Sequence, residues 1–106
     1  MKREEFINKC GAIKKAVSDA VEIGNFDESL VDMVVYFRDT LIDQTINVAC
    51  TPYRSGDRSL AYISGIRSLI QSIKLYSINV DFNDLGFNDD ELREIETKER
   101  QRILAG

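Results

Sequence analysis

Apolar residues recur at three- and four-residue intervals along three long segments of the chain, and this periodicity restricts the fold more than any other feature. The segments span residues 2–23, 29–50 and 59–80. Such spacing places the apolar side chains on one face of an amphipathic α-helix. Gly24 supplies a stop for the first segment, and the polar residues after it supply a start for the second. The sequence therefore predicts an all-α fold, a small antiparallel helical bundle with three principal helices.

The second predicted helix has the widest apolar surface. Its main stripe and the flanking positions comprise Leu30, Val34, Phe37, Leu41 and Val48, with Val31, Val35, Ile42 and Ile46 beside them. This set covers more than half of the helix circumference, whereas a surface helix buries a narrower stripe. We therefore expect helix 29–50 to be the central one.

The third predicted helix carries small residues along one flank. They are Ala61, Ser64, Gly65, Ser68 and Ser72. The distance between packed helices depends on the side chains at their contact, so small residues permit a close approach. We expect another helix to lie against this flank.

The final segment, residues 89–106, predicts a charged helix separate from a helical bundle formed by residues 1–88. Its i,i+4 acid–base pairs, Glu94 with Lys98 and Glu96 with Arg100, are correctly ordered to support a helix. Its apolar face is thin, with Leu92, Ile95 and Ile103 as the main members. This helix is expected to pack at the periphery or to bind a partner.

Composition excludes several kinds of chemistry. A chain of 106 residues suffices for one domain with a single core. It contains no histidine, so it can form neither a Ser-His or Cys-His nucleophile pair nor a zinc site that needs histidine. Two cysteines, Cys10 and Cys50, cannot form a four-cysteine metal site and are expected to be reduced thiols. The sequence thus predicts no metal and no cofactor.

Targeting signals are not visible in the sequence. The opening residues "MKREEF" have no apolar core of the secretory type, and the uncharged apolar stretches are shorter than a membrane span. We expect a cytoplasmic protein without membrane contact.

Charge is distributed unevenly along the chain, whose formal net charge is −4. Residues 25–50 carry one base and five acids, whereas residues 51–80 carry four bases and one acid. These faces are either solvated or complement one another within or between copies of the chain.

Several charged and apolar residues are candidates for an interface. Three acids share one face of the second helix. Arg38 projects into the apolar arc, where it either extends its charged end to solvent at the edge of the arc or, if buried, needs a carboxylate or several carbonyl partners, as in an ion pair at an oligomer interface. The predicted interface residues are Arg38, Asp32, Asp39, Asp43, Leu92, Ile95 and Ile103.

The turn before the third helix raises a different possibility. Arginines near a helix start, with a glycine that allows close backbone approach, suit a phosphate or a carboxylate. The candidate anion-binding residues are Tyr53, Arg54, Arg58, Arg67 and Lys74. The other interpretation is a capped turn between two helices. The acidic chain as a whole argues against duplex nucleic acid.

These observations favour a non-enzymatic helical interaction or assembly protein that associates with itself or with a protein partner through the C-terminal helix. It would be an accessory component of a larger particle or a regulator of another protein, and small helical proteins of the phage or mobile-element type are one such class. The alternative is a module that binds a nucleotide, another phosphate or nucleic acid through the 53–58 turn. A remote alternative is a magnesium-dependent all-α nucleotide pyrophosphohydrolase, although the chain has no EExxE motif followed by ExxD in the right relation.

Overall fold

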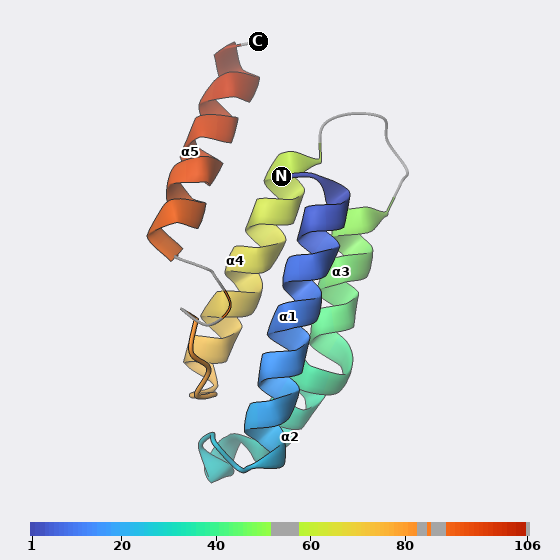
Figure 1. Cartoon of the computed structure of the whole chain (residues 1–106), viewed down its shortest axis with the longest axis vertical. Helices are drawn as coiled ribbons and strands as arrows, with labels where there is room; N and C mark the ends of the chain where they lie inside the picture. Colours follow the sequence, from blue (N-terminus) through green and yellow to red (C-terminus); the bar gives the residue numbers. More distant parts are fainter. Residues whose placement is uncertain (52–57, 83–84, 86–88, 106) are drawn as a thin grey trace.

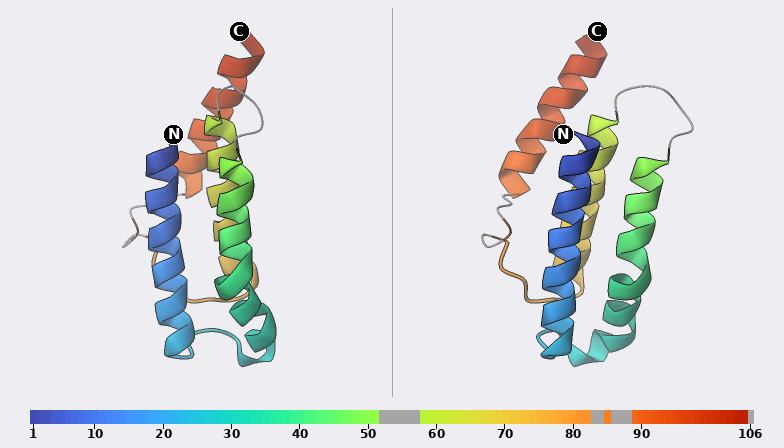
Figure 2. Two further views of the ribbon diagram at one scale, coloured as in Figure 1. Left: turned by 90° about the vertical axis from the view of Figure 1, so that its right-hand side faces the viewer. Right: turned by 45° about the vertical axis from the view of Figure 1, so that its right-hand side comes forward.

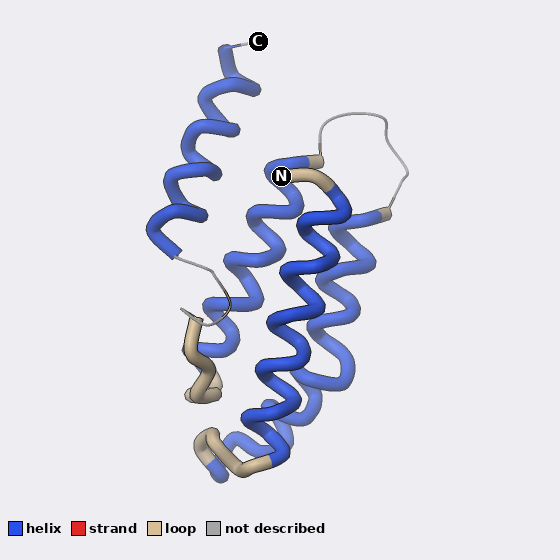
Figure 3. Tube along the Cα trace, viewed as in Figure 1, coloured by secondary structure: helices blue, strands red, loops and turns tan. Residues whose placement is uncertain are grey.

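The computed structural model describes residues 1–51, 58–82, 85 and 89–105. These residues form helices and loops, with no strand among them (Figure 3), which confirms the predicted all-α class. The elements in order are α1 (Arg3–Glu22), the 3₁₀ turn η1 (Glu28–Leu30), α2 (Val31–Tyr36), the π-helical turn η2 (Phe37–Leu41), α3 (Ile42–Cys50), α4 (Ser59–Leu75) and α5 (Asp89–Ala105).

The first three helical segments form a bundle. Figure 1 shows α1, the continuous α2–α3 segment and α4 side by side, with consecutive segments antiparallel, and Figure 2 shows the same arrangement from other directions. Each segment contributes fully buried apolar side chains to one core. They include Phe6, Ile13 and Val17 from α1, Val34, Phe37 and Ile42 from the second segment, and Ile66, Leu69 and Ile73 from α4. The antiparallel bundle predicted from periodicity is therefore confirmed.

The end of α1 follows the sequence signal. Gly24 has a φ of 73°, and its N–H donates to the carbonyl of Val21, while the Asn25 N–H donates to the carbonyl of Ala20. This is a Schellman cap, which requires a residue in the left-handed region, where glycine is unstrained. The helix accordingly ends at Glu22, one residue short of the predicted end.

The third predicted helix ends earlier than expected. It was predicted to reach residue 80, but α4 ends at Leu75. Ser77 has a φ of 55°, and its backbone N–H donates to the carbonyl of Lys74, while the N–H of Ile78 donates to the carbonyl of Ile73. The same kind of cap therefore forms here without glycine. Serine does not mark a left-handed position in a sequence. The prediction therefore followed the apolar periodicity beyond the true end of the helix at Leu75.

The second predicted helix, 29–50, is not one regular α-helix. In the π-helical turn the N–H of Ile42 donates to the carbonyl of Phe37, five residues back instead of four. The next fully buried residue after Phe37 is consequently Ile42, and Ala49 is buried two turns later. Val48, which the sequence placed on the apolar stripe, is 71 % exposed. The extra residue in the turn shifts the apolar face of α3 by one position.

The charged helix α5 lies along α4 and extends past its start (Figure 1). Both i,i+4 pairs predicted on it are present, with Lys98 Nζ 3.4 Å from Glu94 Oε1 and Arg100 Nη2 3.0 Å from Glu96 Oε1. Within the described ranges, no helix has the length and apolar character needed to cross a membrane.

Candidate functional site

A groove of about 430 Å³ runs between α3 and α4 and opens to solvent. Its α4 wall consists of the small residues Ala61, Ser64, Gly65 and Ser68. These positions are i, i+3, i+4 and i+7, the set that forms the hole which receives a side chain from a facing helix. The small-residue flank expected to face a helix thus lines a groove.

Gly65 has a role inside the chain. A Cβ atom at this position would lie 3.3 Å from Phe6 Cε1 and 3.5 Å from Thr45 Cγ2. The missing side chain therefore lets α4 approach both α1 and α3. The ring of Phe6 is also stacked on Tyr62, with centroids 4.8 Å apart, so it has little freedom to move away. The helices that use this close approach are α1 and α3 of the same chain, whereas Ser64 and Ser68 remain exposed on the groove side.

The α3 wall of the groove is uncharged. It is formed mainly by Gln44, Thr45 and Val48 of α3, together with Leu41 at the end of the π-helical turn. Val48 is the most exposed large apolar side chain of this wall because the π-helical turn rotates it away from the core. The groove therefore combines a hole lined by small side chains with a neighbouring apolar side chain that has no cover in the described structure.

Arg58 closes one end of the groove. Its Nε donates to the carbonyl of Ala49 at 3.1 Å, and its Nη2 donates to Ala49 at 2.8 Å and to Val48 at 3.1 Å. The guanidinium thus caps the last carbonyls of α3, where the helix dipole favours a cation. Among the described residues that line the groove, Arg58 is the one charged side chain, and its donors are directed at backbone rather than into the groove.

The described members of the predicted anion site do not converge. Arg67 pairs with Glu96 of α5, and Lys74 Nζ lies 5.7 Å from the ring centroid of Phe82. Arg58 and Arg67 are nine residues apart, roughly 13 Å along a helix axis. Tyr53 and Arg54 lie outside the described residues. The three described cations therefore contact three different parts of the chain, and no common anion pocket is formed by them.

Two of the three predicted acidic interface residues, Asp39 and Asp43, form ion pairs within their own chain. Asp43 accepts from Lys14 of α1 at 2.9 Å, and Arg38 Nε lies 2.7 Å from Asp39 Oδ1. Hydrogen bonding from Arg38 lowers the pKa of Asp39. Arg38 lies at the edge of the apolar arc, half-buried, and its carboxylate partner is its sequence neighbour. Asp32 is exposed at the start of α2.

Of the three predicted interface residues on α5, one is already covered. Leu92 is only 4 % exposed, whereas Ile95 and Ile103 are 41 % and 47 % exposed. The sequence also did not reveal that Glu96 is buried. Its carboxylate accepts from Arg67 of α4 and from Arg100, and the hydrogen bond from Arg67 is the main cause of its lowered pKa. Because positions 67 and 96 are far apart in the sequence, only tertiary structure brings them together.

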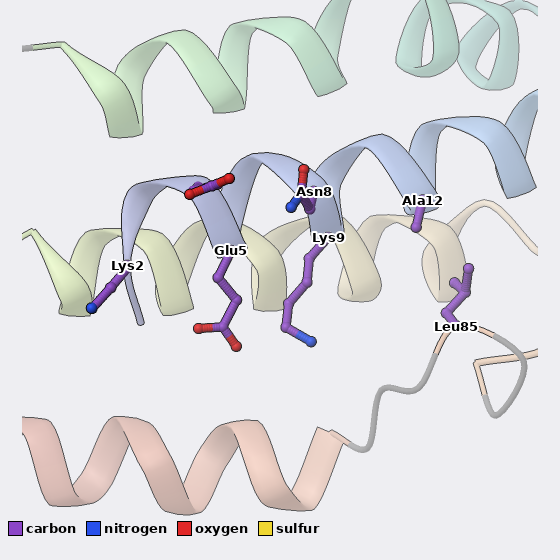
Figure 4. A pocket seen from close by; sticks show the side chains of 7 residues that line it. Lys2, Glu5, Asn8, Lys9, Ala12 and Leu85 are labelled. Carbon is purple, nitrogen blue, oxygen red and sulfur yellow. The ribbon is translucent and has the colours of Figure 1, made fainter.

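A second hollow, of about 500 Å³, runs along α1 on the side that faces α5 (Figure 4). Lys2, Glu5 and Lys9 extend into the space between the two helices, and Leu85 lies at one end of it near Ala12. Its lining mixes both charge signs and matches no site predicted from the sequence. In the described part of the chain, no group of three or more cysteine, aspartate or glutamate side chains could hold a metal ion.

The two cysteines are free thiols. Cys10 is completely buried on α1, and its pKa is raised to about 12, mainly by burial and secondarily by the charge of Cys50. A thiol with so high a pKa is a poor nucleophile.

Of the two hollows described above, the α3–α4 groove is the one that contains a feature predicted from the sequence, the small-residue flank of α4. Comparison with known proteins finds no matching family model, no matching curated protein and no matching solved structure.

Proposed function

We propose that this protein is a non-enzymatic helical interaction protein that self-associates by packing the α3–α4 grooves of two copies against each other. The observation that carries the proposal is the combination within one groove of a small-residue hole on α4 and the 71 % exposed Val48 on α3. A groove that has both a small-residue hole and an exposed apolar side chain can pack against the same groove of a second copy, with Val48 of each copy in the hole of the other.

Two-fold symmetry makes this match reciprocal. In a two-fold pair the same surface patch occurs on both sides, so Val48 of each copy meets the α4 wall of the other. A charged patch would repel itself in such a pair, but the walls of this groove are uncharged. The charge of Arg58 need not oppose this packing, because its guanidinium donates hydrogen bonds to the carbonyls at the end of α3.

The apolar surface of the second helical segment supports the same proposal. Besides Val48, Val31, Met33 and Tyr36 are about half exposed. Burying a valine side chain contributes about 1.5–3 kcal/mol, and symmetry doubles this gain in a pair. Association entropy offsets part of it, so we expect a pair that forms at micromolar concentration rather than a permanent one.

The test is a measurement of mass in solution across a range of micromolar concentrations, by light scattering or sedimentation. We expect the wild-type chain to approach the mass of a dimer as concentration rises. Val48→Glu should stay monomeric, because it would bury two carboxylates against walls that carry no charge apart from Arg58, whose guanidinium is held by the last carbonyls of α3. The matched control is Ile23→Glu. Ile23 is equally exposed, at 76 %, but lies at the end of α1 outside the groove, so this variant should still dimerise.

Circular dichroism on each variant shows whether the fold survives, since both positions are exposed and neither substitution removes core volume. A wild-type chain that remains a monomer at the highest concentration would refute the proposal. Equal effects of the two substitutions would show that self-association uses another surface.

A further inference from the structure

The charges of the chain are separated along its long axis. The molecule measures 47 × 28 × 21 Å, and the helices of the bundle run along the longest dimension (Figure 1). The end of α1, the turn η1 and the start of α2 form one end of the molecule, and hydrogen bonds between Asn25 and Asn79 hold the loop after α4 against it. The starts of α1 and α4, the end of α3 and the last turns of α5 lie at the opposite end (Figures 1 and 2).

The end where α1 meets α2 is acidic. Residues 16–37 and 75–82, which build it, contain no base and six acids, all of them exposed: Asp19, Glu22, Asp27, Glu28, Asp32 and Asp81. The nearest base on α4 is Lys74, whose Nζ lies 5.7 Å from the ring centroid of Phe82. Large apolar side chains are uncovered in the same segments, with Ile23 76 % exposed and Leu75 72 % exposed. We call this surface the acidic end.

The opposite end carries more bases than acids. Its described residues, 1–5, 44–51, 58–66 and 97–105, contain six bases and three acids. Half of these bases, Lys98, Arg100 and Arg102, belong to the last turns of α5, which extend past the start of α4 (Figure 1). Each is paired with a glutamate of α5 but stays more than half exposed, and exposed pairs of this kind are weak. Ile103 and Leu104 are 47 % and 87 % exposed. We call this surface the basic end.

We propose that copies of the chain also associate end to end, with the basic end of one copy against the acidic end of the next. Each end has uncovered apolar side chains, and the excess charges beside them are opposite in sign at the two ends. Such complementarity orients two partners and selects this contact over contacts between like ends. The contact is heterologous, so it leaves a free end on each copy and builds open chains or rings. This inference goes beyond the groove pair and does not use Val48.

Salt separates the two modes of association. The screening length is roughly 10 Å at 0.1 M salt and 30 Å at 0.01 M. At about 0.03 M salt, charges in contact therefore attract, whereas the far ends of a molecule 47 Å long are screened from each other. We expect masses larger than a dimer at this salt concentration and a return to the dimer at physiological salt. The groove pair should depend little on salt, because Arg58 is the one charged residue among the described residues of its walls.

Two single substitutions, one at each end, test the contact. Leu104→Glu puts an acid on the basic end, and Ile23→Lys puts a base on the acidic end. Both side chains are more than three-quarters exposed, so neither change removes core volume. At low salt, light scattering should show association beyond the dimer weakened roughly tenfold in each variant alone, because like charges then face each other.

The mixture of the two variants gives the specific readout. The acid introduced in one variant then faces the base introduced in the other, and the two unchanged ends face each other as in the wild type. Association at low salt should therefore recover on mixing, and a chain carrying both substitutions should associate by itself. Circular dichroism verifies that each variant is folded. A wild-type chain that never exceeds a dimer at low salt, or a mixture that does not recover, would overturn the inference.

Val48→Glu distinguishes the two proposals. This variant should lose the groove pair at physiological salt and keep the salt-dependent association, since Val48 belongs to neither end. If Val48→Glu also abolishes the salt-dependent association, that association uses the groove and the end-to-end contact is wrong. If the wild-type chain dimerises at physiological salt but grows no larger at low salt, the groove proposal stands and the end-to-end contact is refuted.

Discussion

The peripheral position of α5 predicts that one substitution will release this helix without unfolding the bundle. Leu92 is the main apolar residue that α5 buries, at 4 % exposure. Replacing a buried leucine by alanine removes about 2–5 kcal/mol of stability. The smaller figure applies here, because a helix packed on one neighbour can adjust its position. We therefore expect Leu92→Ala to weaken the docking of α5 by about 2 kcal/mol.

Native-state hydrogen exchange measures this effect element by element. A loss of about 2 kcal/mol corresponds to roughly a thirtyfold increase in the opening of α5. Protection of the amides in α1 should change little, because α1 packs mainly against α4 and the α2–α3 segment.

Ile103→Ala is the matched control on the same helix. Ile103 is 47 % exposed, and substitutions at such positions usually change stability by less than about 0.5 kcal/mol. An equal loss of α5 protection in both variants would show that burial does not decide the docking. A parallel loss of protection in α1 after Leu92→Ala would show that α5 and the bundle unfold as one unit, contrary to the reasoning.

Three further predictions concern single side chains. The pKa of Glu96 is lowered in the folded protein, so its carboxylate stabilises the docking of α5 fully above the ordinary glutamate pKa and loses this effect as pH falls through the lowered value. Hydrogen-exchange protection of α5 should therefore fall at acid pH in the wild type. Glu96→Gln should not show this acid dependence. Arg58→Ala removes the guanidinium that caps α3 and should lower stability by about 1–2 kcal/mol in thermal unfolding, whereas Arg58→Lys should recover only part of it; no loss would mean that the cap contributes nothing. Cys10, with a pKa of about 12, should resist alkylation at pH 8 until the protein unfolds, while the half-buried Cys50 reacts first. Mass spectrometry of the labelled peptides shows which cysteine has reacted. Rapid labelling of Cys10 in the native protein would contradict its burial.

Helix periodicity was sufficient to predict the bundle and its antiparallel order. Phe6, Ile13 and Val17 repeat at steps that only a helix can bring to one face, and all three are fully buried. Gly24 marked the end of α1 because a left-handed residue there is unstrained only as glycine. The same cap forms at Ser77, but a serine does not signal a left-handed residue, so the predicted helix extended past the true end of α4 at Leu75.

The candidate site could be predicted only in part. The small residues of α4 were recognisable from their spacing, but the other half of the groove depends on Val48, which periodicity placed on the apolar stripe. One clue was present, the five-residue step between Phe37 and Ile42. The burial of Glu96 had no local signal, since its partner Arg67 is 29 positions away.

The π-helical turn has a consequence for how the chain tolerates change in length. Such a turn is what an α-helix becomes when it absorbs one added residue, with the flanking parts held in place. Deleting one residue between Phe37 and Ile42 would therefore bring these two to ordinary four-residue spacing while both keep their places in the core. Relaxing the turn at full length would instead rotate α3 by about 100° and put Val48 in the place of Ala49 on the buried face. The wide apolar surface of this region thus consists of two narrower apolar faces, one containing Ala49 and the other Val48. The one extra residue in the π-helical turn determines which of the two faces is buried and which is exposed to solvent.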